Sequence, residues 1–418
     1  MRPAGDTPPA GKPASTHVAG GDGVFCPTPA GLSAAAPGLI HDVTRLLDRA
    51  LQGRRPTGVD RVGLAYVGHF RQRSQALVRF AGRWVLFSQA DSRRLFDWLL
   101  SPDGRQARRI RNLVGKAYVL NWRLPAPGSF LLNTGHSGLD RADHAERVRR
   151  YRLRSLYFLH DLIPLAFPEY GRPGEAERHG RRLATMLGAH GLIVNSAATG
   201  RALEAHAARL GRAVPNWIAA HLAAPGFPQP AAERPLPEPY FVVLGTIEPR
   251  KNHLLLLNLW RQLADEHIRP MPRLVVIGQR GWECEQVVDM LERCAALDSI
   301  VLELPGCDDA KLATWLHHAQ ALLFPSFAEG FGIPLVEALA SGTPVVASDL
   351  PVFRELAGEV PDYLDPLDGA GWRQAVLDYA ADHGPRRTAQ LVRMADWQAP
   401  TWQAHFDRVE AFLAQCSG

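Results

Sequence analysis

Short apolar runs alternate with longer amphipathic segments through most of the chain, and this alternation predicts a parallel α/β fold. The clearest unit runs from Ala321 to Asp349, ALLFPSFAEGFGIPLVEALASGTPVVASD. Residues 321–324 predict a buried strand. An apolar stripe between Pro334 and Gly342 predicts a helix with the proline in its first turn and the glycine at its end. A second apolar run, 343–347, completes a strand, loop, helix, strand unit.

The same pattern extends over both halves of the chain. In the first half it predicts strands at 39–46 (ending between Asp42 and Thr44, before a basic connector), 76–80, 83–87, 129–133, 156–159, 191–195 and 217–221. It predicts helices there at 55–71, 93–112, 175–187 and 199–210. In the second half it predicts strands at 240–244, 273–277 and 301–304, and helices at 253–266, 311–319 (capped by Asp309) and 402–414.

The length of 418 residues exceeds what one ordinary core organises, so two domains are expected. A stretch with prolines at 225, 228, 230, 235 and 237 is typical of a linker. We therefore predict an irregular tail at 1–37, a first domain at 38–224, a linker at 225–238, a second domain at 239–395 and a terminal helical segment at 396–418.

The loop inside the 321–349 unit carries the strongest chemical signal. Gly330 and Gly332 let backbone N–H groups approach an anion at a helix N-terminus, where phosphate binds well. Glu329 and Glu337, eight positions apart, flank that site, and carboxylates accept hydrogen bonds from hydroxyl groups. A nucleotide-sugar, with a diphosphate between ribose and sugar, satisfies all of these groups. An ordinary crossover with solvated acids is the alternative.

Two further strand ends carry candidate groups. After the strand at 240–244, a turn from Gly245 leads to Arg250 and Lys251, which are suitable donors for a diphosphate; a surface basic pair is the alternative. After the strand at 156–159, His160 and Asp161 occupy the edge where open α/β sheets bind ligands; a structural histidine is the alternative. His136 is a weaker candidate of the same kind.

The string FAEGFGIPLVEALASGTPVVASD closely resembles the donor-site motif of family 4 glycosyltransferases, which are retaining enzymes of the GT-B fold. The resemblance implies two doubly wound Rossmann-like domains that face a cleft, with a terminal helix crossing back to the first domain. It implies that Glu329 contacts the transferred sugar and Glu337 the ribose. The loop amides of Phe331 and Gly332, followed by Ile333, would hold the distal phosphate.

Other segments extend the resemblance. FLHDLIPLAFPEY resembles the family segment whose histidine, here His160, lies at the reaction centre. Lys251 matches the basic residue that binds the phosphates, whereas Thr246 stands where the family often has an arginine, a role for which Arg250 is the candidate substitute. The glycines that the resemblance places around the donor are Gly58 with its neighbour Arg61, Gly245, Gly278 and Gly306.

Composition restricts the setting. The five cysteines lack C-x-x-C spacing, so neither zinc nor a disulfide framework is expected, and a cytoplasmic location fits. We find no transmembrane or signal segment and no sign of a nucleic-acid partner. The region 93–123 is rich in arginine and includes Trp98, Leu99, Leu100 and Trp122. Either a solvated helix face or a peripheral contact with an anionic membrane explains it.

The resemblance implies a retaining hexosyltransferase of polysaccharide assembly, and we expect His160, Glu329, Lys251 and Arg250 to be its catalytic groups. Because the second half looks most like bacterial mannosyl- and other hexosyltransferases, GDP-mannose is the favoured donor and a UDP-hexose the alternative. A glycan or lipid-linked oligosaccharide is the expected acceptor. No cofactor or metal is expected, since the sequence has no D-x-D triplet. A dinucleotide oxidoreductase is disfavoured because no G-x-G-x-x-G follows a strand. A non-catalytic sugar-binding homologue is a further alternative.

Overall fold

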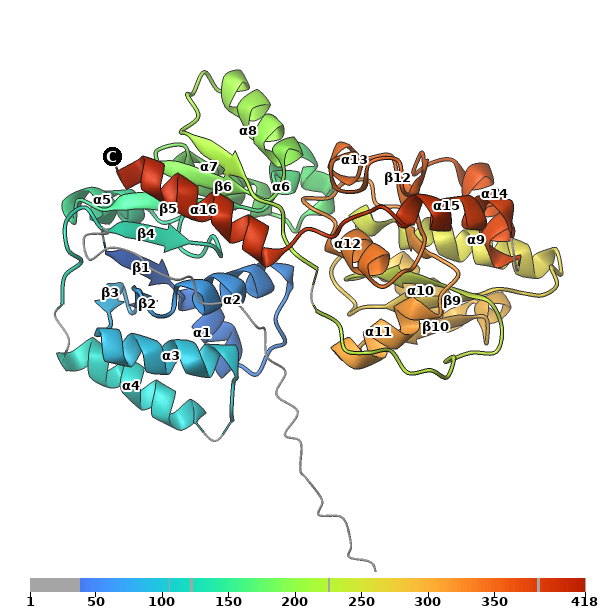
Figure 1. Cartoon of the computed structure of the whole chain (residues 1–418), viewed down its shortest axis with the longest axis horizontal. Helices are drawn as coiled ribbons and strands as arrows, with labels where there is room; N and C mark the ends of the chain where they lie inside the picture. The colour runs from blue at the N-terminus through green and yellow to red at the C-terminus, as the bar shows by residue number, and fades with distance from the viewer. Residues whose placement is uncertain (1–37, 105, 121–122, 225, 382–383, 418) are drawn as a thin grey trace, which may run out of the picture.

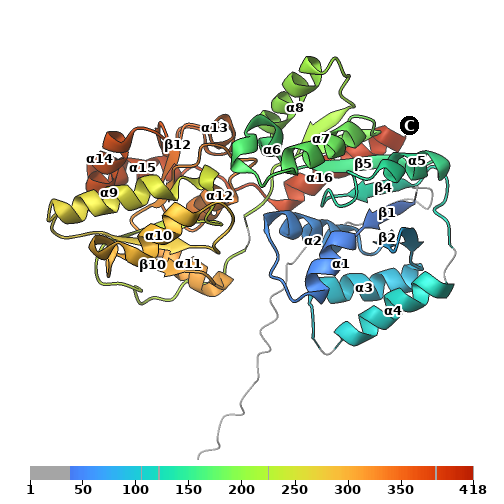
Figure 2. The same cartoon turned by 180° about the vertical axis from the view of Figure 1, so that it is seen from behind.

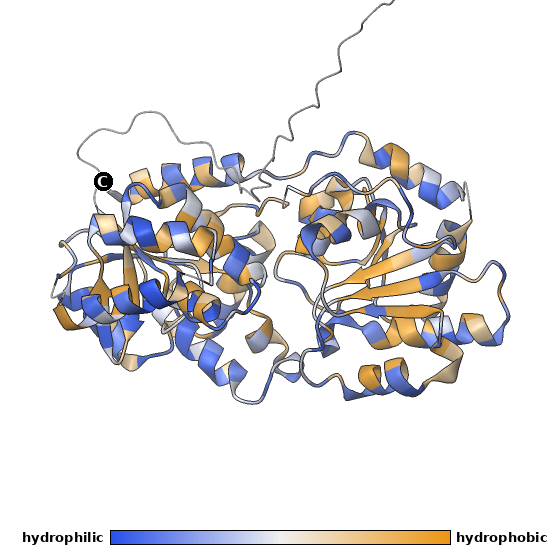
Figure 3. Cartoon of the chain, turned by 90° about the horizontal axis from the view of Figure 1, so that it is seen from below, coloured by the Kyte–Doolittle hydropathy of each residue, from blue (hydrophilic) through white to orange (hydrophobic). Residues whose placement is uncertain are grey.

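The computed structural model describes residues 38–104, 106–120, 123–224, 226–381 and 384–417. Within them the chain forms two sheets side by side, each flanked by helices (Figure 1; Figure 2). Apolar residues concentrate on the strands and on the helix faces that cover them (Figure 3). The tail predicted at 1–37 lies outside the described residues.

The first sheet has seven strands in the order β3-β2-β1-β4-β5-β6-β7, and every pair is parallel except β2 with β3. Its strands are β1 (Leu39–Asp42), β2 (Ser74–Phe80), β3 (Arg83–Leu86), β4 (Phe130–Asn133), β5 (Arg154–Leu159), β6 (Gly191–Val194) and β7 (Trp217–Ala219). Its helices are α1 (Thr44–Leu51), α2 (Gly58–Phe70), α3 (Gln89–Leu100), α4 (Ala107–Leu120), α5 (Ala142–Arg150), α6 (Ile163–Ala166), the short 3-10 turn η1 (Pro168–Tyr170), α7 (Glu175–Met186) and α8 (Ala197–Arg209).

The second sheet has six strands, all parallel, in the order β10-β9-β8-β11-β12-β13. Its strands are β8 (Tyr240–Leu244), β9 (Arg273–Ile277), β10 (Val301–Leu304), β11 (Leu322–Phe324), β12 (Val345–Ser348) and β13 (Asp362–Leu364). The helices are η2 (Pro249–Lys251), α9 (His253–Asp265), α10 (Glu285–Arg293), η3 (Ala295–Leu297), α11 (Asp309–His317), α12 (Ile333–Ala340), α13 (Pro351–Ala357), α14 (Gly369–Ala380), α15 (Pro385–Met394) and α16 (Trp402–Ser417).

Both sheets reverse their strand order once, and open α/β sheets bind ligands at that point. In the second sheet the reversal lies between β8 and β11. The loop with Arg250 and Lys251 follows β8, and the loop with Glu329 follows β11. In the first sheet the reversal lies between β1 and β4, and the loop with His136 follows β4. Topology therefore brings the predicted loops to the binding edges.

Local signals explain most element boundaries. Thr57 and Asp60 form a capping box at the start of α2, and the Ser196 side chain accepts from Thr199 N at the start of α8. Gly342, at φ 74°, follows the last turn of α12.

Three predicted details are wrong. The first strand ends at Asp42, within the expected range, but residues 44–51 form the helix α1 where a basic connector was expected. The helix expected at 93–112 is two helices, α3 and α4, with Pro102 and Gly104 between them. Asp308, not Asp309, caps α11, because its side chain accepts from Lys311 N.

The last helix, α16, packs on the first sheet's side of the molecule (Figure 1). His405 Nε2 lies 2.9 Å from the Tyr66 hydroxyl, and the Phe406 and Tyr66 rings meet edge to face at 5.1 Å. Arg154 of β5 donates to the backbone carbonyl oxygens of Cys416 and Ser417. Helix α16 thus completes the core of the first domain. We propose that the domain boundary lies at 225–238, between β7 and β8.

Candidate functional site

The centre of the site is a buried charge cluster at the carboxyl ends of β8 and β11. Lys251 Nζ lies 2.5 Å from Glu329 Oε1, and Arg250 Nη1 lies 2.8 Å from Glu329 Oε2. Ser326 Oγ donates to Glu329 Oε1 at 2.8 Å. Burial alone raises the pKa of Glu329, but Arg250 and Lys251 outweigh it and hold the pKa at about 2. Glu329 is therefore a permanent carboxylate at neutral pH.

Two glycines make room for this cluster. Gly245 has φ 135°, and a Cβ there would lie 3.3 Å from Lys251 Cε, so the lysine side chain runs across this glycine. A Cβ on Gly278 would lie 1.9 Å from the Gly245 carbonyl oxygen, so the strand ends of β8 and β9 need glycine to pass each other. Thr246 is exposed, and because threonine carries no charge, that position contributes no cation.

A third carboxylate, Glu248, was not predicted. Its Oε1 lies 2.6 Å from Arg250 Nη2, and its side chain is 3% exposed. Burial raises its pKa, against the opposing charges of Arg250 and Lys251. The signal that could have found it is a glutamate two positions before an arginine at a strand's carboxyl end.

The loop before α12 touches the first sheet's side of the molecule. A Cβ on Gly330 would lie 2.7 Å from the His160 carbonyl oxygen, and the Gly330 carbonyl oxygen accepts from Thr199 Oγ1 at 3.2 Å. Gly332, at φ 98°, is the N-cap of α12. Gly58, which begins α2, faces Ile333, which begins α12: a Cβ on Gly58 would lie 3.2 Å from Ile333 Cδ1. Two helix N-termini therefore converge here, as the sequence predicted for an anion site.

Glu337 lies on α12 and forms an ion pair with an arginine from the first half of the chain. Arg61 Nη1 lies 3.2 Å from Glu337 Oε1, and Arg61 Nη2 lies 3.0 Å from Asp309 Oδ1. Burial raises the pKa of Glu337 to about 7, although Arg61 opposes the shift. Nearby, Arg55 Nη1 would lie 3.4 Å from a Cβ on Gly306. The segment 55–61 therefore covers the region that the resemblance assigns to the nucleoside.

The opposite edge carries three histidines. His160 Nε2 donates to the Thr134 carbonyl oxygen at 2.7 Å, which leaves Nδ1 as the acceptor of a neutral ring. His136 Nε2 donates to Phe158 O and His179 Nε2 to Asp161 O. Burial lowers the pKa of each ring. The Asp161 carboxylate accepts from Ile163 N at 3.0 Å, so the His160 ring is oriented by a backbone carbonyl and not by Asp161.

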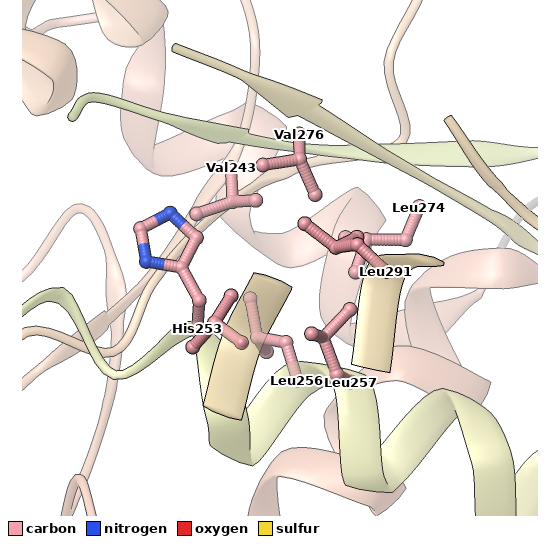
Figure 4. A pocket seen from close by; sticks show the side chains of 8 residues that line it. Val243, His253, Leu256, Leu257, Leu274, Val276 and Leu291 are labelled. Carbon is pink, nitrogen blue, oxygen red and sulfur yellow. The ribbon is translucent and has the colours of Figure 1, made fainter. Parts of the chain in front are cut away.

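A small apolar gap beside the cluster belongs to the core (Figure 4). His253, the first residue of α9, faces into it with aliphatic side chains of β8, β9, α9 and α10. Burial lowers the pKa of His253 to about 3, and among the described residues neither ring nitrogen has a hydrogen-bond partner. The other residues that line the gap are aliphatic, and His253 is neutral at neutral pH, so the gap adds no charge to the site.

The structure brings most predicted site residues to one interface between the two sheets. The residues gathered there are Gly58, Arg61, His160, Gly245, Arg250, Lys251, Gly278, Gly306, Gly330, Phe331, Gly332, Ile333, Glu329 and Glu337. Most of them lie on a loop at the carboxyl end of a strand or on the first turns of the helix that follows, whereas Gly58 and Arg61 lie on the first turn of α2, which follows α1.

Comparison with known proteins supports the same region. Residues 229–360 match the family described as "Glycosyl transferases group 1". The chain is 33% identical over 147 residues to the serotype-specific mannosyltransferase WbdA of Escherichia coli, covering 34% of this chain and 17% of the relative. It is 31% identical over 164 residues to the O-antigen chain mannosyltransferase B of Escherichia coli, covering 39% and 42%. The chain thus spans less than half the length of these relatives.

Solved structures match the whole architecture. HepE of Anabaena in complex with UDP-glucose has a TM-score of 0.63 at 16% identity, covering 90% of this chain and 99% of that chain. Sucrose-phosphate synthase from Thermosynechococcus elongatus has a TM-score of 0.56 at 17% identity, covering 91% and 96%. At such identity the likeness concerns the fold alone, and it confirms the predicted GT-B architecture.

Proposed function

We propose that this protein, whose residues 229–360 belong to the group 1 glycosyl transferases and whose chain has the GT-B fold, transfers a hexose from a nucleotide-sugar to a glycan or lipid-linked acceptor. One observation carries the proposal. The charged atoms of Lys251 and Arg250 each lie within 2.8 Å of a Glu329 carboxylate oxygen, at the strand-order reversal of the second sheet. Cations for a diphosphate and an acid for sugar hydroxyls therefore share one site.

The proposed chemistry follows from the charges. Negative charge grows on the departing diphosphate as the glycosidic bond breaks, and fixed cations stabilise it. The ammonium of Lys251 has three N–H donors, one of which donates a hydrogen bond to Glu329. Glu329, ionised at all physiological pH, accepts hydrogen bonds from the sugar and has no proton to give. No cofactor beyond the donor is proposed.

Retention of anomeric configuration is part of the proposal. A double displacement requires a second carboxylate that flanks the same bond. Glu337 is instead held by Arg61 beside Asp309, in the region assigned to the ribose. We therefore favour front-face attack by the acceptor, assisted by the leaving phosphate.

The relatives favour GDP-mannose as the donor, since WbdA and the O-antigen chain mannosyltransferase B are mannosyltransferases by name. The complex of HepE with UDP-glucose supports a UDP-hexose as the alternative. A screen of nucleotide-sugars that measures released GDP or UDP tests both. We expect release with GDP-mannose, and thermal stabilisation by GDP but not by NAD. Stabilisation by NAD alone would indicate an oxidoreductase, and binding without turnover would indicate a non-catalytic homologue.

We also propose a peripheral contact of α4 with an anionic membrane, which would bring the site to a lipid-linked acceptor. No described helix is both long and apolar enough to cross a bilayer. Residues 104–124 contain no Asp or Glu, and the described arginines and lysine among them are exposed. Beside these charges lie Val119, Leu120 and Leu124, which are 63%, 66% and 69% exposed. Phe80, 52% exposed, packs against Tyr118 of α4.

Charge and apolar surface together fit an anionic phospholipid bilayer better than solvent. Each basic residue near such a surface contributes about 1 kcal/mol, and exposed Leu and Val side chains insert at the interface. The contact surface differs from the one expected, because Trp98 and Leu99 are buried in the core. Trp122 lies outside the described residues.

Co-sedimentation with vesicles tests this contact. We expect binding to vesicles with phosphatidylglycerol, weaker binding to pure phosphatidylcholine, and a decrease with salt. Replacing Val119 and Leu120 with Asp should remove most of the binding, whereas the same change at Leu391 and Val392, exposed on α15, should not. Equal binding by both double variants would favour the solvated-face hypothesis.

A further inference from the structure

Glu248 is a buried carboxylate to which the proposed reaction assigns no role. It follows Ile247, which bridges to Arg280 beside β8 and β9, so its backbone is held at the sheet's edge. Its side chain is 3% exposed and reaches Arg250 Nη2 at 2.6 Å. A buried carboxylate is costly unless it is paired, and Arg250 is the partner that the structure provides.

The guanidinium of Arg250 joins two acids. Its Nη2 binds Glu248, and its Nη1 binds Glu329 Oε2 at 2.8 Å and the Ala328 carbonyl oxygen at 2.9 Å. Arginine has donors fixed in one plane, so anchoring one end of the fork fixes the direction of the other. Glu248 therefore fixes where Arg250 points, and Arg250 holds Oε2 of the Glu329 carboxylate, while Lys251 and Ser326 hold Oε1.

We propose that Glu248 is a positioning residue for sugar transfer, which acts through Arg250 to hold Glu329 in its working orientation. The inference rests on the proposed function, because it assumes that Glu329 contacts the transferred sugar. The inference gives the two adjacent cations different roles. Lys251 binds the diphosphate, and Arg250 mainly links Glu248 to Glu329 as a clamp.

A double-mutant cycle on kcat tests the clamp. Glu248→Ala should lower kcat about 100-fold, the effect of a reacting group displaced by about 1 Å. The KM for the nucleotide-sugar should change less than threefold, since Lys251 and Glu337 remain. Arg250→Lys keeps the charge but lacks the fork, and it should lower kcat similarly. Since both changes break one clamp, the double variant should be no slower than Arg250→Lys alone.

Asp362 provides the matched control. It also holds two arginines, Arg386 at 3.0 Å and Arg393 at 2.6 Å, but on the far edge strand β13. Asp362→Ala should lower the unfolding temperature and leave kcat unchanged. A kcat for Glu248→Ala within twofold of wild type, losses that multiply in the double variant, or an equal loss in Asp362→Ala would each overturn the inference.

A conservative variant covers the case in which Glu248→Ala does not fold. Glu248→Gln keeps the shape and one acceptor but not the charge, and it should lower kcat less than Arg250→Lys does. An unchanged kcat in Glu248→Gln, when the alanine variant is unfolded, would count against the clamp. If the wild-type protein transfers no hexose from any donor, the proposed function fails instead, and that outcome is separate from these.

Discussion

The two binding edges that face each other differ in how they treat charge. The edge of the second sheet gathers fixed ions: Lys251, Arg250, Glu329 and Glu248 lie within direct contact. The first sheet's side also has ion pairs, such as Asp60 with Arg45 and Arg49, but the three histidines at its edge are neutral imidazoles whose Nε2–H groups donate to backbone carbonyl oxygens. A diphosphate needs compensating charge, whereas a sugar hydroxyl needs directed acceptors and donors. We therefore propose that the second sheet's edge binds the leaving group and that the first sheet's edge orients the sugar or its acceptor.

The largest expected effect is that of acid on stability, because acid protonates the buried histidines. Burial lowers the pKa of His41, His144 and His405 to about 4, and it lowers those of His136, His160 and His179 as well. Between pH 6.5 and about 4 the unfolded chain binds more protons, so the stability is complete above 6.5 and declines below it. Each imidazole contributes about 1.4 kcal/mol per pH unit in that window.

We therefore expect the unfolding temperature to fall steeply between pH 6.5 and 5, as measured by calorimetry at constant ionic strength. Replacing His405 with Gln should make this fall less steep, because one titrating ring is removed. A constant unfolding temperature over this range would show that these rings are not held neutral.

At the charged edge of the second sheet, replacement of Glu329 should have the largest effect on kcat. Glu329→Ala should lower kcat by at least about 10³-fold, the upper range for removing one group that acts at the transition state. Affinity for the nucleotide, measured by calorimetric titration, should change little, because Lys251 and Glu337 remain. Full activity of this variant at saturating donor would contradict the assignment of Glu329 to the sugar.

Lys251→Ala should act on binding. Removing the charge-assisted contact of Lys251 with phosphate is expected to weaken binding of the nucleoside diphosphate by about 2 kcal/mol, or roughly 30-fold. The nucleoside monophosphate, which lacks the distal phosphate, should lose less. Lys311→Ala, an exposed lysine on α11, is the control. Equal losses for both nucleotides would place Lys251 away from the distal phosphate.

The smallest effect should come from Glu337. Because burial raises its pKa to about 7, it is protonated below that pH and accepts hydrogen bonds less well. We expect the KM of the donor to decrease severalfold as pH rises from 6 to 8. Glu337→Gln should show a pH-independent KM over this range. A dependence that persists in Glu337→Gln would have to come from another group.

The fold was predictable because its signals are local. Apolar runs of strand length, glycine turns and caps such as Ser196 each act over a few residues, and they fix the alternation of strands and helices. The site motif was equally local, with Glu329 and Glu337 on one loop and helix. Misplaced details, such as Asp309 instead of Asp308 as the cap of α11, reflect two adjacent residues of the same type.

The remaining features depend on contacts that no local pattern reveals. Arg61 and Glu337 are 276 positions apart and meet only because the two sheets face each other. The link from Glu248 to Glu329 passes through Arg250 and requires the folded loop. The neutral state of His160 depends on burial and its tautomer on the Thr134 carbonyl, neither of which its sequence neighbours specify.

The position of α16 has a consequence for the order of events during synthesis. Tyr66, Phe70 and Phe158 are covered by residues from the end of the chain, including Phe406. These residues are synthesised after the whole second sheet. The first half therefore leaves the ribosome with an uncovered apolar seam, which α16 covers only once it has emerged as well. Deletion of α16 should therefore cause the first half to aggregate and leave the second half folded.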